Sequence, residues 1–166
     1  ALEYSQKVLN RNQQAGNQYG VANTYFTMGK IYLNTADHEQ SLQYLQKALS
    51  MKRQLEDQVE VASILRLIGE NHMQQSRHQK ALSYFREALS EARTQNQREE
   101  IKNTYHALYQ SYKKAGNHER PLDFYTQYSD LKDSLNNHRI SELEMQYDFE
   151  RRQEQLRYEQ KKKEAV

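Results

Sequence analysis

Three histidines stand 40 residues apart, at His38, His78 and His118, and imidazole is a common metal ligand in proteins. A row of them would form a ladder of metal sites if successive copies came within reach of one ion. Neighbouring packed helices lie roughly 8–10 Å apart, whereas a zinc–nitrogen bond is about 2 Å long. One ion therefore cannot bridge equivalent positions of successive repeats, and we predict half-buried packing histidines that hold no metal.

The other side chains give no pattern for catalysis. The chain has no cysteine, which excludes thiolate metal ligands, disulfides and a cysteine nucleophile. It also has no Gly-rich phosphate loop, no His-Glu-x-x-His pair and no readable Ser/His/Asp arrangement. We therefore predict no catalytic residue, no cofactor and no enzymatic activity for these residues.

Tyrosine and lysine are the remaining residues that could bind a class of ligand directly. The chain has 13 tyrosines, and we expect most of them to be packing rings rather than a platform for nucleic-acid bases, because five fall at repeated positions: Tyr25, Tyr32, Tyr105, Tyr112 and Tyr125. The run Lys161–Lys163 could contact anionic lipid, but cations also suit the C-terminal end of a solvated helix. The formal net charge of +2 adds no field that would attract nucleic acid.

The elements that position these residues repeat every 40 residues. Leu42–Leu49 (LQYLQKAL) returns as Leu82–Leu89 (LSYFREAL) and, more loosely, as Leu122–Ser129, and an earlier copy is Leu2–Leu9. A fixed period of this size is typical of stacked two-helix units, because one such unit cannot bury its own apolar face. We therefore predict an all-α fold, a solenoid of antiparallel helix pairs followed by a long C-terminal helix.

Within each unit, the first helix has apolar residues at i, i+4, i+7, i+8 and i+11, which share one helical face. Asp37, Ser76 and Asn117 follow this helix and are predicted N-caps of the second helix, and Ser76 with Gln79 has capping-box spacing. The face itself consists of Val21, Tyr25, Met28, Gly29 and Tyr32, then Val61, Leu65, Ile68, Gly69 and His72, then Ile101, Tyr105, Leu108, Tyr109 and Tyr112.

These residues resemble the tetratricopeptide repeat, whose motif has a large residue, Leu-Gly, an aromatic, and then Ala, an aromatic and Ala at set offsets. The resemblance covers residues 1 to about 130 and implies a right-handed solenoid that binds proteins or peptides. The second copy matches through Leu65, Ile68, Gly69, His72, Ala81, Phe85 and Ala88, and the first through Tyr25, Met28, Gly29, Tyr32, Ser41, Leu45 and Ala48.

Two departures from the family motif predict local differences. The family period is about 34 residues, so we expect the six additional residues after Ala48 and Ala88 to lengthen the second helix and the link to the next unit. Tyr109 replaces the motif glycine, so we expect a wider or re-packed third hairpin. His72 stands at the aromatic position and is predicted to lie in the core.

The resemblance also implies a binding surface, because the second, fifth, ninth and twelfth motif positions face the concave groove of such arrays. The asparagines and Gln110 would hold a peptide backbone, and Lys30, Arg66 and Lys113 favour an acidic or C-terminal carboxylate ligand. Reversal of the charge at Arg66 and Lys113 is expected to abolish binding without unfolding. Carried onto this chain, the groove positions are Asn23, Phe26, Lys30 and Leu33; Ser63, Arg66, Glu70 and Met73; Asn103, His106, Gln110 and Lys113.

The register divides the chain into segments. Residues 1–20 form the second helix of a truncated repeat plus a linker, residues 21–60 repeat 1, residues 61–100 repeat 2 and residues 101–135 a degenerate repeat 3. Residues 136–166 form a C-terminal capping or signalling helix, with a break in the chain expected at Asn136 and Asn137. The register places Met145 and Phe149 where Tyr105 and Tyr109 stand, as if this helix capped the array.

The tail is similar to the segment that closes the tetratricopeptide sensor region of bacterial membrane signalling proteins, chiefly sensor histidine kinases of two-component systems. The likeness lies in Leu131–Leu135, Ile140–Glu150 and the Glu/Gln/Lys-rich run to Val166. It implies a periplasmic sensor region in a dimeric receptor, with a membrane helix and an output module beyond Val166. Met145, Phe149, Arg152 and Leu156 have a heptad-like 4-3-4 spacing, which over so few turns fits either a coiled coil or a solvated cap.

The leading hypothesis is a non-catalytic protein- or peptide-interaction module that serves as such a sensor region. The alternatives are a cytoplasmic adaptor or scaffold, and a regulator with a separate DNA-binding domain. The expected partners are a protein or peptide in the concave groove and a second copy of the chain along the C-terminal helix. Nucleic acid is not expected, and a membrane only through a segment outside these residues.

Overall fold

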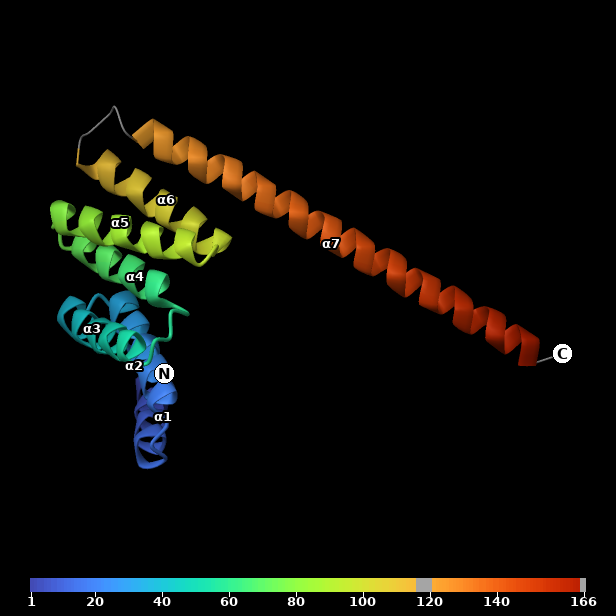
Figure 1. Cartoon of the computed structure of the whole chain (residues 1–166), viewed down its shortest axis with the longest axis horizontal. Helices are drawn as coiled ribbons and strands as arrows, with labels where there is room; N and C mark the ends of the chain where they lie inside the picture. The colour runs from blue at the N-terminus through green and yellow to red at the C-terminus, as the bar shows by residue number, and fades with distance from the viewer. Residues whose placement is uncertain (116–120, 165–166) are drawn as a thin grey trace. The chain divides into compact units, whose positions relative to one another are not determined.

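The structure is a computed structural model of the chain, and it describes residues 1–115 and 121–164. Within these two ranges all regular structure is helical, which confirms the predicted all-α fold. The chain forms two compact units, Ala1–Tyr128 and Ser129–Val166. The helices are α1 (Leu2–Gln14), α2 (Gln18–Asn34), α3 (His38–Gln54), α4 (Val61–Gln74), α5 (His78–Thr94), α6 (Arg98–Lys114) and α7 (Pro121–Glu164), shown in Figure 1.

The first unit is a stack of antiparallel helix pairs, as the repeat predicts. Helix α2 packs on α3 and α4 packs on α5, while α1 lies on α2, α3 on α4 and α5 on α6 (Figure 1). The core lies between these helices, because the apolar face of each one is covered by the next. The largest buried cluster includes Leu45, Leu49, Ile64, Leu65 and Ile68.

Two glycines allow the paired helices to approach closely. A Cβ atom placed on Gly29 would lie 2.7 Å from Cδ2 of Leu45, and one on Gly69 would lie 2.5 Å from Cε1 of Phe85. Leu45 and Phe85 are fully buried, so neither side chain has free space into which it could move. In the first pair, Ser41 Oγ also donates a hydrogen bond to the Gly29 carbonyl oxygen at 2.9 Å.

The third helix pair is held by aromatic rings, which confirms that Tyr109 re-packs this hairpin. The Tyr109 ring lies on α6 and meets the Tyr125 ring of α7 with 5.2 Å between centroids. The ring of Phe124 stacks on Tyr112 at 5.4 Å and lies 6.4 Å from Tyr105. A tyrosine at the glycine position thus replaces close backbone approach with contact between side chains.

The helix caps follow the sequence prediction in one case and not in another. Asp37 caps α3, because its Oδ1 accepts a hydrogen bond from the Gln40 backbone N–H at 3.1 Å. Ser76 is not the cap of α5: it has a left-handed φ of 59° just after α4, and Arg77 is the N-cap residue. Asn117 and His118 lie outside the described residues. The Asn17 side chain caps α2, which the sequence pattern did not predict.

The six additional residues per repeat extend the second helix, as predicted, since α3 continues to Gln54 and α5 to Thr94. The two links that follow differ. Between α5 and α6 the link is residues 95–97, whereas residues 55–60 separate α3 from α4. Lys52, which is 2% exposed, closes this longer link through ion pairs to Asp57 at 2.7 Å and to Glu60 at 3.1 Å. Glu60 has a left-handed φ of 71°.

Helix α7 is continuous from Pro121 to Glu164, so the predicted break at Asn136 and Asn137 is wrong. Asparagine lowers helix propensity by well under about 1 kcal/mol per residue, and two such residues in a 44-residue helix do not end it. In the second unit, Met145 and Phe149 are 62% and 63% exposed, although the repeat register places them at core positions.

Three described histidines of the first unit, His38, His72 and His78, are buried or half-buried, as predicted, whereas His106 is exposed. His38 and His78 are half-buried, whereas His118 is not among the residues that can be described. His72 is buried and its ring stacks on Tyr84, with 5.4 Å between centroids and 21° between ring planes. Burial lowers the pKa of His72, and the nearby cations of Lys80 and Arg77 lower it further.

We expect acid to destabilise the array partly through His72. Because its folded pKa is depressed, the neutral ring contributes stability fully above the unfolded pKa of about 6.5, and this contribution is lost as the pH falls through the folded pKa. His72→Phe keeps a stacked ring without a titrating group, so the unfolding free energy should fall less between neutral and acidic pH. Urea denaturation across this range measures the slope, with exposed His106→Phe as control. Equal slopes for His72→Phe and the native chain would contradict the prediction.

Candidate functional site

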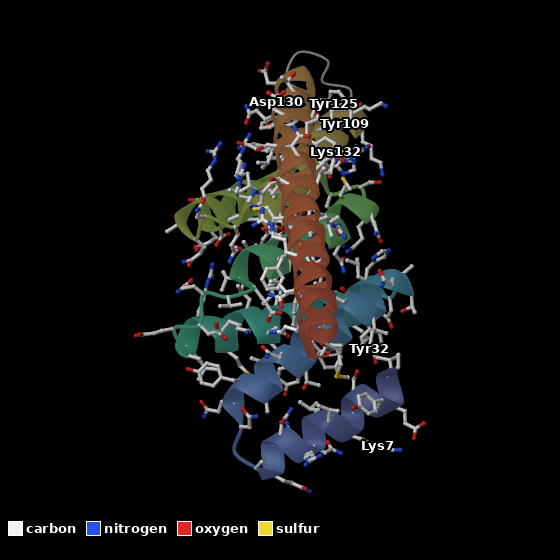
Figure 2. All side chains as sticks on the ribbon, turned by 90° about the vertical axis from the view of Figure 1, so that its right-hand side faces the viewer. Lys7, Tyr32, Tyr109, Tyr125, Asp130 and Lys132 are labelled. Atoms are coloured by element: carbon white, nitrogen blue, oxygen red, sulfur yellow. The ribbon has the colours of Figure 1, made fainter. Side chains whose placement is uncertain are left out.

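The candidate site is the face formed by α2, α4 and α6, on which the predicted groove positions lie. The structure places these positions at three levels of exposure. Asn23, Lys30, His106 and Lys113 are exposed; Ser63, Arg66, Glu70, Met73, Asn103 and Gln110 are half-buried; Phe26 and Leu33 are buried. Figure 2 shows the side chains over the ribbon, seen from another side of the molecule.

Phe26 and Leu33 stabilise the array instead of facing a ligand. They are 8% and 6% exposed and belong to the same cluster as Leu45 and Ile64. Although both were expected to offer apolar contact to a ligand, little of either side chain is exposed. Lys30 remains exposed, and its Nζ lies 5.3 Å from the centroid of the Phe26 ring, which is within the range of a cation–π contact.

Arg66 is occupied by partners within the chain. Its guanidinium forms ion pairs with Glu70, one turn along α4, and with Glu100 of α6. Ser63 Oγ donates to the second carboxylate oxygen of Glu100 at 2.7 Å. Burial lowers the pKa of Arg66, but the two carboxylates outweigh it and the net pKa is raised, so the cation is permanent. This charge ties α4 to α6, and it is not free for an acidic ligand.

We therefore expect Arg66→Ala to destabilise the first unit by about 2–3 kcal/mol, because it leaves the carboxylate of Glu100 buried without its cation. This replaces the expectation that the charge at Arg66 can be reversed without unfolding. Adding Glu100→Gln should recover most of the loss. Urea unfolding followed by circular dichroism measures both. Lys7→Ala breaks an exposed pair with Glu3 and should cost less than about 0.5 kcal/mol; a similar cost for Arg66→Ala would contradict the prediction.

Aromatic rings surround the groove positions on α6. His106 lies 5.0 Å from Tyr128 between ring centroids, and Tyr125 is 47% exposed beside it. Lys113 Nζ lies 5.8 Å from the centroid of Tyr109. Tyr125 was predicted to be a packing residue, but about half of its side chain is free to meet a ligand. The signal in the sequence was Tyr109, which stands at the motif glycine position and whose ring contacts Tyr125.

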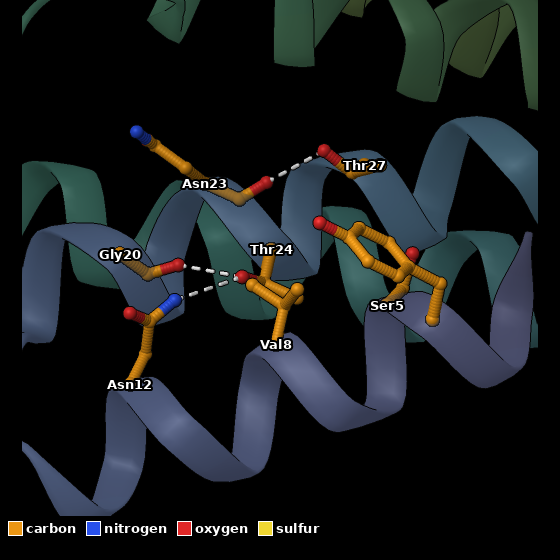
Figure 3. Close-up of a pocket in the computed structure, with 8 residues that line it drawn as sticks. Ser5, Val8, Asn12, Gly20, Asn23, Thr24 and Thr27 are labelled. Atoms are coloured by element: carbon orange, nitrogen blue, oxygen red, sulfur yellow. Dashed lines mark hydrogen bonds between the residues drawn. The ribbon is translucent and has the colours of Figure 1, made fainter.

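A cavity of about 320 Å³ opens between α1 and α2, and sequence reasoning missed it (Figure 3). It arises because small residues replace large ones: Ser5 and Thr24 stand where Leu45 and Ile64 stand one repeat later. Comparing equivalent positions of the repeats would have revealed it. The lining residues are Tyr4, Ser5, Val8, Asn12, Gly20, Asn23, Thr24 and Thr27.

The hydroxyl groups of the two threonines in this cavity already donate to the backbone (Figure 3). Thr24 Oγ1 donates to the Gly20 carbonyl oxygen at 2.7 Å and accepts from Asn12 Nδ2 at 3.4 Å. Thr27 Oγ1 donates to the Asn23 carbonyl oxygen at 2.9 Å. The walls therefore offer carbon surface and hydroxyl lone pairs, which suit an apolar side chain flanked by N–H donors. Asn23 also belongs to the groove face, so cavity and groove meet at this residue.

Among the residues whose positions are described, no group of three or more His, Asp or Glu side chains is arranged to hold a metal ion. Within the same ranges, no helix is both long and apolar enough to cross a membrane.

Comparison with known proteins supports the assignment of the fold. Residues 1–54 match the family model described as tetratricopeptide repeat. No curated protein matches the chain. The chain is similar to the solved TPR domain of Arabidopsis FLU, with a TM-score of 0.67 and 20% identity over 70% of this chain and 98% of that one.

Two further solved structures share the fold. One is aspartyl phosphate phosphatase F from Bacillus subtilis, with a TM-score of 0.67 and 18% identity over 72% of this chain and 31% of that chain. The other is the Rap conjugation gene regulator of plasmid pLS20 in complex with the Phr* peptide, with a TM-score of 0.62 and 24% identity over 66% and 30%. The chain spans about a third of the length of each of these two proteins.

Proposed function

We propose that this tetratricopeptide-like array is a non-catalytic module that binds a protein or peptide ligand along α2, α4 and α6. The observation that carries the proposal is the meeting of cavity and groove at Asn23. A surface that combines a cavity for one side chain with the carboxamides of Asn23, Asn103 and Gln110 suits an extended peptide. The peptide named in the pLS20 regulator complex shows that a protein of this fold can hold such a ligand.

The polar side chains of the groove fit a peptide backbone. Asn23 is exposed, and its carboxamide makes no hydrogen bond to any other residue that the structure describes. Asn103 and Gln110 are half-buried on α6. A carboxamide can donate to a peptide carbonyl and accept from a peptide N–H at once, so these residues can hold a ligand whatever its sequence. With Arg66 occupied, Lys30 and Lys113 are the groove cations left for an acidic ligand.

A random peptide library tests the proposal, because selection from it requires no assumption about the sequence of the ligand. Phage-displayed dodecapeptides would be selected on the 166-residue chain, and selected peptides would be titrated by fluorescence polarisation. Asn23→Ala with Asn103→Ala should raise the Kd roughly tenfold or more, since two hydrogen bonds to the ligand are lost. Thr27→Trp should have an effect of similar size, because the ring would fill the cavity.

The control is Gln46→Ala, an exposed residue of α3 away from the groove helices, which should leave the Kd unchanged. Circular dichroism of each variant shows whether it is folded. If peptides selected on the native chain bind both groove variants with native affinity, the ligand does not occupy this face.

We further propose that the module is the sensor region of a larger bacterial signalling protein, as the resemblance of the tail implies. Ligand binding in the groove would move α7, whose first residues pack on α6 through Phe124 and Tyr125. The periplasmic location belongs to this proposal. The sequence that follows Val166 in the gene tests it: a membrane helix within a few dozen residues supports a receptor, and its absence excludes one.

The second candidate is a cytoplasmic adaptor or scaffold, or a regulator with a separate DNA-binding domain. One feature bears on this candidate: Met145, Phe149 and Leu156 are exposed on one face of α7, and the charged residues of that face, Glu142 and Arg152, would meet opposite charges of a second copy only in an antiparallel pair. A receptor sends both chains of a dimer in the same direction, whereas an adaptor has no such constraint.

A further inference from the structure

In the second unit, α7 exposes apolar residues on two sides, Ile140 and Leu143 on one and a stripe of three residues on the other. Met145, Phe149 and Leu156 are 62%, 63% and 54% exposed. Large apolar side chains grouped on one helical face and left in water commonly mark an interaction surface. These three residues are four and seven residues apart along the chain, which keeps them on one face of the helix.

A spacing of alternating four and three residues also includes Arg152, between Phe149 and Leu156, and continues toward the N-terminus through Glu142 and His138. The full series is His138, Glu142, Met145, Phe149, Arg152 and Leu156. His138 Nε2 and Glu142 Oε1 lie 3.1 Å apart, with both side chains more than half exposed. A helix pair that uses this face must therefore bring one acidic, one basic and one imidazole side chain per chain into its contact layers.

A parallel pair would bring like charges of the two chains together. In a parallel coiled coil each layer consists of the same residue from both chains. Glu142 would meet Glu142 of the second copy, and Arg152 would meet Arg152 of the second copy. Like charges brought together in a partly desolvated seam repel, and each loses hydration without gaining a counter-charge.

An antiparallel pair brings opposite charges of the two chains together instead. We propose that two copies of the chain associate through α7 as an antiparallel helix pair centred on position 147. In this register, Met145 meets Phe149 of the second copy, and Glu142 meets Arg152 of the second copy. His138 meets Leu156 of the second copy. Each layer occurs twice by symmetry, which gives two apolar layers at the centre flanked by two pairs of opposite charge.

Charge complementarity also selects this register among antiparallel ones. A shift of the pair by one heptad, so that equivalent position numbers sum to 287 instead of 294, sets Glu142 against Met145 and Arg152 against Leu135. Both charges would then lie against apolar residues and lack a counter-charge. The register centred on 147 therefore pairs both charged residues that the stripe contains.

The first test is a charge-reversal cycle measured by sedimentation equilibrium between about 1 and 500 μM, which brackets weak association. Glu142→Arg and Arg152→Glu should each raise the dimer Kd roughly tenfold, and the two together should restore it. His138→Gln controls for the lost contact with Glu142, and Asp133→Arg for charge on the opposite side of the helix. In a parallel pair each single reversal replaces one pair of like charges by another. A dimer Kd that is unchanged in both single variants would therefore overturn the proposal.

The second test reports orientation directly. The chain has no cysteine, so Asp133→Cys provides a unique site for a spin label. Asp133 is exposed. At about 1.5 Å per residue, the antiparallel register places the two labels roughly 40 Å apart along the axis. In a parallel pair the labels would lie at the same level on the outer faces of the two helices, roughly 20 Å apart, which is the width of the pair.

The label distance and the charge-reversal cycle together distinguish the antiparallel pair from a parallel pair and from a monomer. A dipolar distance near 40 Å together with a restored double reversal supports the antiparallel pair. A short distance, or a chain that stays monomeric at about 500 μM, overturns it. Phe149→Glu should abolish association in either orientation, which confirms that the measured dimer uses this stripe. A short distance would also favour the receptor setting, and it would leave peptide binding by the groove untouched.

Discussion

Gly69→Leu is expected to open the second helix pair and to lower the unfolding free energy by about 3 kcal/mol. A single Cβ at this position already lies 2.5 Å from Phe85 Cε1, and a leucine adds three more carbon atoms in the same direction. Phe85 is fully buried, so it cannot move aside without disturbing its own cluster. Thermal and urea unfolding of the 166-residue chain would measure the loss.

The matched controls separate a local clash from a general effect of leucine. Ser83→Leu adds a similar side chain at an exposed position of α5 and should cost less than about 0.5 kcal/mol. Gly69→Leu should cost much less in a Phe85→Ala background, because the truncated ring leaves space. Equal costs of Gly69→Leu in both backgrounds would show that α4 and α5 do not meet at these residues.

Lys52→Met is expected to cost about 3 kcal/mol, because it strands two carboxylates around a buried position. The cation is 2% exposed and lies 2.7 Å from Asp57 and 3.1 Å from Glu60. Burial alone lowers the pKa of Lys52, but hydrogen bonds and attraction from Asp57 and Glu60 raise it above its ordinary value. Since the folded pKa is raised, this stability is fully present below about pH 10.5 and is lost as pH rises through the folded pKa.

The rescue variant tests whether charge or packing is responsible. Asp57→Asn with Glu60→Gln, added to Lys52→Met, removes the stranded charges and should recover at least half of the loss. The next repeat shows that a neutral residue can occupy this position, since Ala92 is its equivalent and is fully buried. Lys7→Ala serves as the exposed control. If the rescue variant is no more stable than Lys52→Met, packing rather than charge sets the cost.

The two predictions differ in what made them possible. Gly69 was identified from its spacing, because the 40-residue register fixed which residue of α4 must face α5. Lys52 had no such signal, because its equivalents at the repeat interval are Asn12, Ala92 and Lys132, so the position has no constant residue type. Lys52 forms its ion pairs with Asp57 and Glu60 in the longer link between α3 and α4. The link between α5 and α6 is shorter, so this feature does not follow the repeat.

For the groove as well, residue spacing predicted some features and the tertiary structure revealed others. Spacing placed twelve residues on three helices, and ten of them are exposed or half-buried on the described surface. Spacing did not show that Phe26 and Leu33 are covered by neighbouring helices, or that Arg66 meets Glu100. Residues 66 and 100 are 34 positions apart, so no local pattern links them.

The sequence by itself determined the helix pairs, their order and the residues at their contacts, because helical periodicity and the 40-residue repeat are local properties. Only the tertiary structure decided which charges are satisfied within the chain, where a cavity remains, and whether α7 breaks. Ion pairs such as Arg66 with Glu100 depend on side chains from different helices, and the cavity depends on how Ser5 and Thr24 together fill a space. Packing and charge pairing depend on all the neighbours that a residue has in space. These neighbours are fixed only when the helices pack against one another.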